Sequence, residues 1–158
     1  MAKTRQAGNA PTGIWPKRGE IYLTALDPTV GHEIKKTRPV VIIQNDTSNR
    51  YSAVTIVAPI TSTVRLPLSP LHVLLPAESS TGLAVASVAV FNQIRAVDRS
   101  RLIKKLGAVD PLVMLLVDEA IKVAFGLTSS EPGPGSPPNI TRAISEGTAS
   151  LKTGRYEP

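Results

Sequence analysis

The sequence predicts a small, mainly β fold, either a barrel or a strongly twisted sheet, that ends in a helix. Three observations predict it. Short apolar or alternating segments follow one another at close intervals between turn-forming residues, as in small all-β domains. The pattern changes only at Asp98, and the stretch PLVMLLVDEAIKVAF after Asp110 is helical by length and composition. The chain has 158 residues and only 4% aromatic residues, which suits one domain with a core of Val, Ile, Leu and Ala.

Five or six segments are expected to form strands. Residues 20–26 (EIYLTAL) alternate, and Asp27-Pro28 ends that segment because proline cannot donate to a ladder. Residues 39–43 (PVVII) are apolar at consecutive positions, which predicts a central strand buried on both faces. A turn over residues 44–49 makes residues 53–60 the hairpin partner. Further short strands are predicted over residues 71–75, 84–91 and 93–97.

Two helices are expected after the strands. Asp98 can cap a short helix through Arg101 to residue 106, which Gly107 would end. Asp110 followed by Pro111 is a stronger start, since it places an N-cap acceptor before the residue best suited to the first helical position. The apolar surface of this second helix is too wide for one neighbour. We therefore expect one face to meet the sheet and another to meet a partner subunit.

Composition predicts three regions and a cytoplasmic protein. Residues 1–16 and 128–158 are rich in Pro, Gly and small polar residues, so we expect a disordered basic leader and a disordered tail around a domain of residues 17–127. Cysteine is absent, which excludes a disulfide framework and favours a reducing cytoplasm. The histidines, His32 and His72, do not suggest a metal centre, and no apolar run could span a bilayer. We expect no metal, no cofactor and no membrane.

The net charge of +6 suggests nucleic acid, but much of the excess lies before residue 20. Within the predicted domain, the informative cluster is Lys35, Lys36 and Arg38. Proline after Arg38 pushes it into extended geometry at the mouth of a strand. A second predicted strand ends in the hydroxyl of Thr61. An Arg and a Thr at two strand ends could form a preorganised phosphodiester site if the strands are neighbours.

Four motifs in order resemble the MazF/PemK (Kid) toxins, which are endoribonucleases of bacterial type II toxin-antitoxin systems. These motifs are RGEIYLTALDPTVGHEIKKTRPVVIIQND, VAPIT, NQIRAVDRSRL and the closing helix. The resemblance implies an SH3-like β-barrel that acts as a homodimer. It also implies cleavage of single-stranded mRNA at short sequences without a metal ion, leaving a 2′,3′-cyclic phosphate and a 5′-hydroxyl. A cognate antitoxin would block the RNA groove, and operator DNA would be bound only through that antitoxin.

The resemblance implies that Arg38, Thr61 and His32 are catalytic. Where one branch of the family has a carboxylate before the Gln, this chain has Asn92, which leaves the general base open. Arg38 can hold the phosphate and Thr61 can orient it or the attacking hydroxyl, whereas His32 is a candidate base by its pKa. We predict that RNA is also contacted by Lys35, Lys36, Arg65, Asn92 and Gln93.

Two alternatives belong to other classes. The same small barrel occurs in non-enzymatic toxins that bind a protein target such as gyrase, and Asn92 is compatible with an inactive family member. Arg38, Thr61 and His32 could also be ordinary surface, strand-end and loop residues. Incubation with unstructured RNA in EDTA distinguishes these hypotheses.

Overall fold

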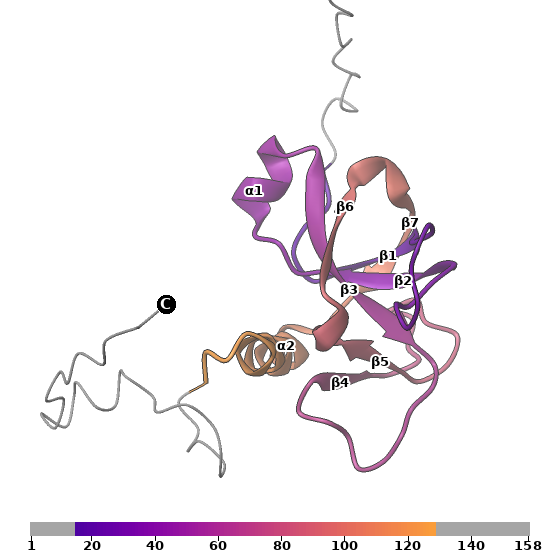
Figure 1. The fold of residues 1–158 in the computed structure, drawn as a ribbon, viewed down its shortest axis with the longest axis vertical. Coiled ribbons are helices and arrows are strands. Elements are labelled where there is room, and N and C mark those ends of the chain that lie inside the picture. The colour runs from indigo at the N-terminus through magenta and orange to yellow at the C-terminus, as the bar shows by residue number, and fades with distance from the viewer. Residues whose placement is uncertain (1–14, 129–158) are drawn as a thin grey trace, which may run out of the picture. The chain divides into compact units, whose positions relative to one another are not determined.

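A computed structural model describes residues 15–128 as an antiparallel β structure with two α-helices (Figure 1). The elements, in chain order, are β1 (Glu20–Ala25), β2 (Thr37–Ile42), α1 (Asp46–Tyr51), β3 (Val54–Thr61), β4 (His72–Leu75), β5 (Ser87–Val90), the 3-10 turn η1 (Phe91–Gln93), β6 (Arg95–Asp98), the 3-10 turn η2 (Arg99–Arg101), β7 (Leu102–Ala108) and α2 (Pro111–Ala124). A mainly β fold that contains helices and ends in one is therefore confirmed. The predicted leader and tail lie almost wholly outside the described residues.

The strands form one seven-stranded sheet in the order β4-β5-β3-β2-β1-β7, with β6 also paired to β3. The outer edge of β3 is shared, because its residues 54–57 pair with β6 and its residues 60–61 pair with β5. The two partners lie at opposite ends of β3 (Figure 1). The ladders of residues 15–128 do not return on themselves, so the predicted barrel is an open sheet.

The core lies on both faces of β2. Val40 and Ile42 belong to one buried cluster, and Val41 belongs to the other, so the prediction of a central, doubly buried strand is confirmed. Helix α2 packs Val117 and Ala120 against the second cluster. Its start is the predicted one, because Asp110 accepts a hydrogen bond from the amide of Leu112 at 2.8 Å.

The segment predicted as a turn over residues 44–49 is instead the start of α1. Asn45 caps this helix by accepting the amide of Ser48 at 2.8 Å. Asn49 is fully buried, and its amide oxygen accepts from Thr55 Oγ1 at 2.8 Å. Turn-forming residues cap and fill a helix here because their side chains find partners inside the fold.

The prediction of a short helix after Asp98 is wrong. Asp98 does cap a turn, by accepting the amide of Ser100 at 2.8 Å, but that turn is only η2. The chain then extends as β7, whose Lys105 forms an ion pair of 2.7 Å with Glu20 on β1. Gly107 is not a helix end: a Cβ there would lie 2.2 Å from the carbonyl oxygen of Ser80. The glycine is needed for a close backbone approach.

Candidate active site

Arg38 and Thr61 stand at matching positions of two neighbouring strands. β2 and β3 pair in a register that sets Val40 opposite Pro59. The ladder ends at this pair, and Arg38 and Thr61 lie two residues beyond it on their strands. Because side chains alternate along a strand, Arg38, Thr61 and Pro59 project from the same face of the sheet. The condition set from the sequence, that the two strand ends be neighbours, is met.

The guanidinium of Arg38 is held by one edge and free at the other. Its Nε donates to the carbonyl of Lys35 at 3.0 Å, and the side chain is half-buried. Its two Nη atoms have no partner among the described residues. They are the pair of donors that an oxyanion can accept bidentately. The hydroxyl of Thr61 accepts the amide of Thr63 at 3.2 Å and keeps its own proton to donate.

The loop of residues 27–36, which carries the predicted basic cluster, is fixed at its base. The amide of Leu26 donates to the carbonyl of Lys36 at 3.0 Å, and Lys36 has a left-handed φ of 71°. The guanidinium of Arg101 donates to the carbonyl of Asp27 at 2.5 Å. The backbone amide of Lys36 and then the hydroxyl of Thr29 hold the pKa of Asp27 below its usual value. These contacts tie the two ends of the loop together at its base.

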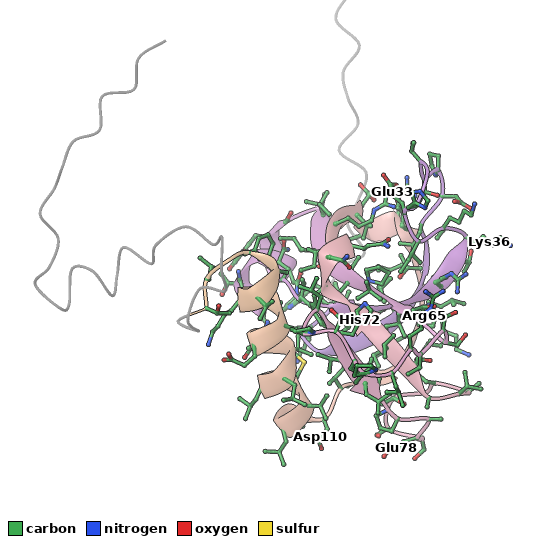
Figure 2. All side chains as sticks on the ribbon, turned by 60° about the horizontal axis from the view of Figure 1, so that its bottom comes forward. Glu33, Lys36, Arg65, His72, Glu78 and Asp110 are labelled. Atoms are coloured by element: carbon green, nitrogen blue, oxygen red, sulfur yellow. The ribbon has the colours of Figure 1, made fainter. Side chains whose placement is uncertain are left out.

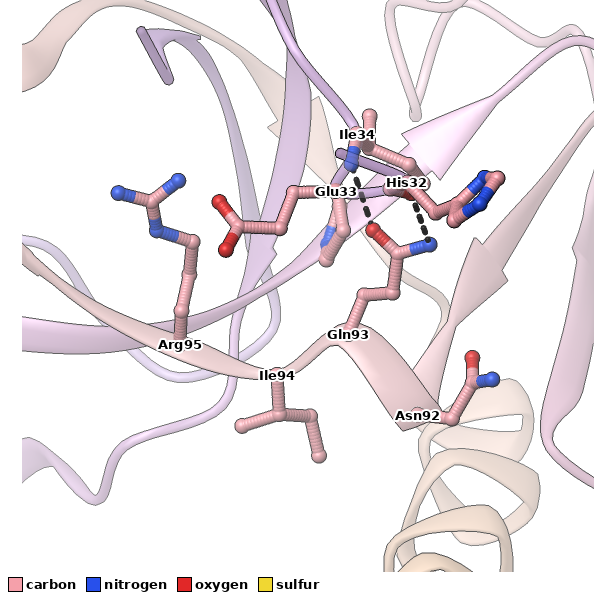
Figure 3. A pocket seen from close by; sticks show the side chains of 8 residues that line it. His32, Glu33, Ile34, Asn92, Gln93, Ile94 and Arg95 are labelled. Atoms are coloured by element: carbon pink, nitrogen blue, oxygen red, sulfur yellow. Dashed lines mark hydrogen bonds between the residues drawn. The ribbon is translucent and has the colours of Figure 1, made fainter. Parts of the chain in front are cut away.

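A groove with a volume of about 570 Å³ lies between the loop tip and η1. The residues that line it come from the loop, from β3 and from the segment around η1: His32, Glu33, Ile34, Pro59, Asn92, Gln93, Ile94 and Arg95. Gln93 bridges its two walls (Figure 3), since its Oε1 accepts the amide of Ile34 at 2.6 Å and its Nε2 donates to the carbonyl of His32 at 3.4 Å.

The groove brings together three of the predicted site residues, His32, Asn92 and Gln93. Gln93 was predicted to start a strand, but it belongs to η1, and β6 begins two residues later. Lys35, Lys36 and Arg65 are exposed and do not line the groove. Figure 2 shows Lys36 and Arg65 on two different loops.

The two charged groove residues that were not predicted as site residues are Glu33 and Arg95. The carboxylate of Glu33 extends toward the guanidinium of Arg95 (Figure 3). Arg95 also donates to the carbonyl of Leu26 at 3.1 Å, which ties β6 to the loop base. The signal for Glu33 was its position directly after His32, in the same polar loop. No pattern in the sequence distinguished Arg95 from an exposed strand residue.

Residues 17–125 match the sequence pattern of the family described as the PemK-like, MazF-like toxin of type II toxin-antitoxin systems. The chain belongs to this family. It is 40% identical over 111 residues to endoribonuclease EndoA of Bacillus subtilis (strain 168), a match that covers 70% of this chain and 95% of that protein. It is 41% identical over 113 residues to endoribonuclease MazF of Staphylococcus epidermidis, covering 72% and 93% of the two chains.

Solved structures of MazF toxins share the fold. The Mycobacterium tuberculosis toxin MazF-mt6 superposes with a TM-score of 0.58 at 27% identity, over 69% of this chain and 98% of that one. MazF (Form-I) from Deinococcus radiodurans superposes with a TM-score of 0.62 at 25% identity, over 72% and 99%. The predicted assignment to the MazF/PemK toxins is thus confirmed.

Two properties of this MazF/PemK member concern possible cofactors and membranes. Within residues 15–128, no three His, Asp or Glu side chains are grouped so that they could hold a metal ion. None of the helices in the same range is long and apolar enough to cross a membrane.

Proposed function

We propose that this endoribonuclease toxin cleaves single-stranded mRNA at short sequences, without a metal ion, and leaves a 2′,3′-cyclic phosphate and a 5′-hydroxyl. The proposal is supported chiefly by the pairing of β2 with β3, since their ladder ends at Val40 and Pro59, two residues before Arg38 and Thr61, and Pro59 lines the groove. Relatives of this family that are about 40% identical carry the name endoribonuclease.

The proposed reaction is an attack of the ribose 2′-oxygen on the adjacent phosphorus, with departure of the 5′-oxygen. The two free Nη donors of Arg38 bind the non-bridging phosphate oxygens and stabilise the charge that grows on them. Thr61 donates a hydrogen bond that orients the phosphate. Arg38 cannot remove the 2′-hydroxyl proton, because a guanidinium hardly deprotonates.

A general base for the 2′-hydroxyl must come from another residue. Asn92 has no basic form. The groove offers two side chains that can act as a general base, the imidazole of His32 and the carboxylate of Glu33. We propose that one of these two groups takes the proton, and that Lys35, Lys36 and Arg65 contribute phosphate contacts outside the reacting centre.

The test is a cleavage assay on end-labelled unstructured RNA in excess EDTA. We expect cutting at a few short sequences and products with a 5′-hydroxyl. Arg38→Ala should reduce the rate by about a hundredfold or more, as loss of a transition-state donor does. Lys104→Ala is the matched control, since this exposed cation lies on β7, outside the groove. A folded wild-type protein that cuts no RNA would favour the non-enzymatic or inactive alternatives, and 5′-phosphate products would contradict the proposed chemistry.

We also propose a homodimer and a cognate antitoxin. A stripe of α2 opposite its packed face exposes Leu112, Leu115 and Leu116, with Leu112 at 74% exposure. Helix faces of this kind in water mark an interface. One structure with 25% identity is titled as an endoribonuclease in complex with its cognate antitoxin, which supports such a partner here. An acidic antitoxin segment would compete with RNA for Lys35 and Lys36 in the loop and for Arg38 at the start of β2.

A further inference from the structure

A cluster of two aromatic rings and one cation lies at the end of α1, away from the groove. The guanidinium carbon of Arg50 is 5.2 Å from the ring centroid of Trp15 and 5.3 Å from that of Tyr51. Both distances are within the range of a cation-π contact. We call Trp15, Arg50 and Tyr51 the stacking cluster.

Packing explains the Trp15 side of this cluster and not the Tyr51 side. Trp15 and Arg50 together hold the chain against α1. Tyr51, however, is 77% exposed. A large aromatic residue left this open contributes little to folding, and such surface marks a binding site.

The charge of this surface favours an anionic partner. None of the ion pairs of the described residues includes Arg50. The nearby carboxylate of Asp46 is already engaged, because it accepts the backbone amide of Arg18 at 2.7 Å. Lys17, two residues after Trp15 in the sequence, is a further exposed cation that takes no part in the ion pairs of the described residues. Exposed aromatic faces beside unpaired cations are what single-stranded nucleic acid uses, with bases on the rings and phosphates at the cations.

The stacking cluster is separate from the groove. Val54, at the start of β3, and Pro59, in the groove, are five residues apart, which is about 17 Å along a strand. The family match begins at residue 17, so Trp15 lies outside it. Arg50 and Tyr51 lie within the matched range, so the cluster combines two residues of that range with one that precedes it.

We propose that the stacking cluster binds bases of single-stranded RNA outside the segment that is cut. This inference rests on the proposed ribonuclease function, and it extends the substrate site to flanking nucleotides. A short RNA that fills only the groove does not reach the cluster. A longer strand gains stacking on Tyr51 and a phosphate contact at Arg50.

Trp15 provides a direct probe, because it is the only tryptophan in the full chain. The ligands are single-stranded oligodeoxynucleotides, which lack the 2′-hydroxyl and so survive the proposed reaction. We expect a strand of about 20 nucleotides to quench Trp15 fluorescence, and one of about five nucleotides to leave it unchanged. Tyr51→Ala and Arg50→Ala should each weaken binding of the longer strand about fivefold or more. Tyr51→Phe keeps the ring and Lys104→Ala removes a distant exposed cation, so both should bind as the wild type does.

Cleavage of a short RNA that contains the cut site is measured in the same variants and should be unchanged. If the longer strand binds without altering Trp15 fluorescence, or binds equally well to Tyr51→Ala, the inference is overturned. Quenching by an acidic polypeptide but not by the longer strand would also overturn it, in favour of a protein partner. A wild-type protein that binds the longer strand at this cluster but cuts no RNA would instead contradict the proposed function alone.

Discussion

Gln93 connects the two walls of the groove through one side chain. Its Oε1 is already occupied by the amide of Ile34 at 2.6 Å, and its Nε2 lies 3.4 Å from the carbonyl of His32. A side chain engaged in this way has little capacity left to read a base. We propose that Gln93, besides its predicted RNA contact, holds the loop tip, which carries His32 and Glu33.

Gln93→Ala should release the loop tip without unfolding the protein. Loss of a hydrogen bond worth about 1 kcal/mol predicts that hydrogen exchange at the amide of Ile34 accelerates about fivefold. Gln93→Glu keeps an acceptor for Ile34, so its exchange rate should stay near that of the wild type. Unchanged exchange in Gln93→Ala would mean that other contacts hold the tip.

Asp27 should titrate below its ordinary pKa because the amide of Lys36 and the hydroxyl of Thr29 both donate to its carboxylate. A lowered folded-state pKa means that the contribution to stability is present above the ordinary value of 3.8 and is lost as the pH falls through the folded value. NMR titration of the Asp27 carboxyl carbon measures this midpoint. Thr29→Val removes one donor and should move the midpoint part of the way back, and a midpoint that does not move would assign the shift to Lys36 alone.

At the scale of single residues, the sequence could predict that Arg38 and Thr61 lie near strand ends, because turn-forming residues and a following proline are visible in the chain. It could not predict that Gln93 is engaged internally, because its partners are about 60 residues away in the sequence. Arg18 was missed as a structural residue for the same reason. In the sequence, its charge belongs to the excess of cations before residue 20. In the fold, Arg18 forms a 2.6 Å ion pair with Asp118 on α2.

At the scale of elements, local patterns predicted β1, β2, β3 and α2 well, since their burial follows directly from apolar spacing. They failed for β7, where Gly107 and the cap at Asp98 suggested a helix. Tertiary pairing with the open edge of β1 overrides that local preference. Local patterns also predicted a turn where the structure has α1, because the turn-forming residues there find partners inside the fold.

Gly107→Ala distinguishes the strand from the predicted helix end. A new Cβ would lie 2.2 Å from Ser80 O and 2.5 Å from Thr81 C, both backbone atoms that cannot rotate away. We expect a loss of about 2 kcal/mol or more of unfolding free energy in urea titration. Gly126→Ala is the control, because a Cβ there meets nothing within 4 Å and only the positive φ costs about 1 kcal/mol. Equal losses at the two positions would contradict the close approach.

At the scale of the whole molecule, the width of the apolar surface on α2 was readable from the sequence, whereas the orientation of the helix was not. The packed face uses Val117 and Ala120 and leaves Leu115 and Leu116 at 60% exposure. The orientation of α2 on the sheet decides which of these leucines stay exposed and could contact a second subunit in the proposed dimer.

Leu115→Glu should convert the proposed dimer into a monomer, because a carboxylate would be buried at the interface without a partner. Analytical ultracentrifugation at micromolar concentration measures the change. Lys122→Ala on the same helix removes only an exposed pair with Glu119 and should leave the dimer intact. A wild-type protein that sediments as a monomer would refute the proposal.

β3 contributes Thr61, the groove residue Pro59 and the apolar surface at Val54, and it pairs with three other strands. When the register of a strand slips by one residue, its side chains move to the opposite face of the sheet. Because partner strands pair with both ends of β3, an insertion or deletion within it would cause such a slip. The loop of residues 62–71 carries no such constraint from a ladder. Among homologues of this chain, length variation should therefore accumulate after Thr61 and be nearly absent from residues 54–61.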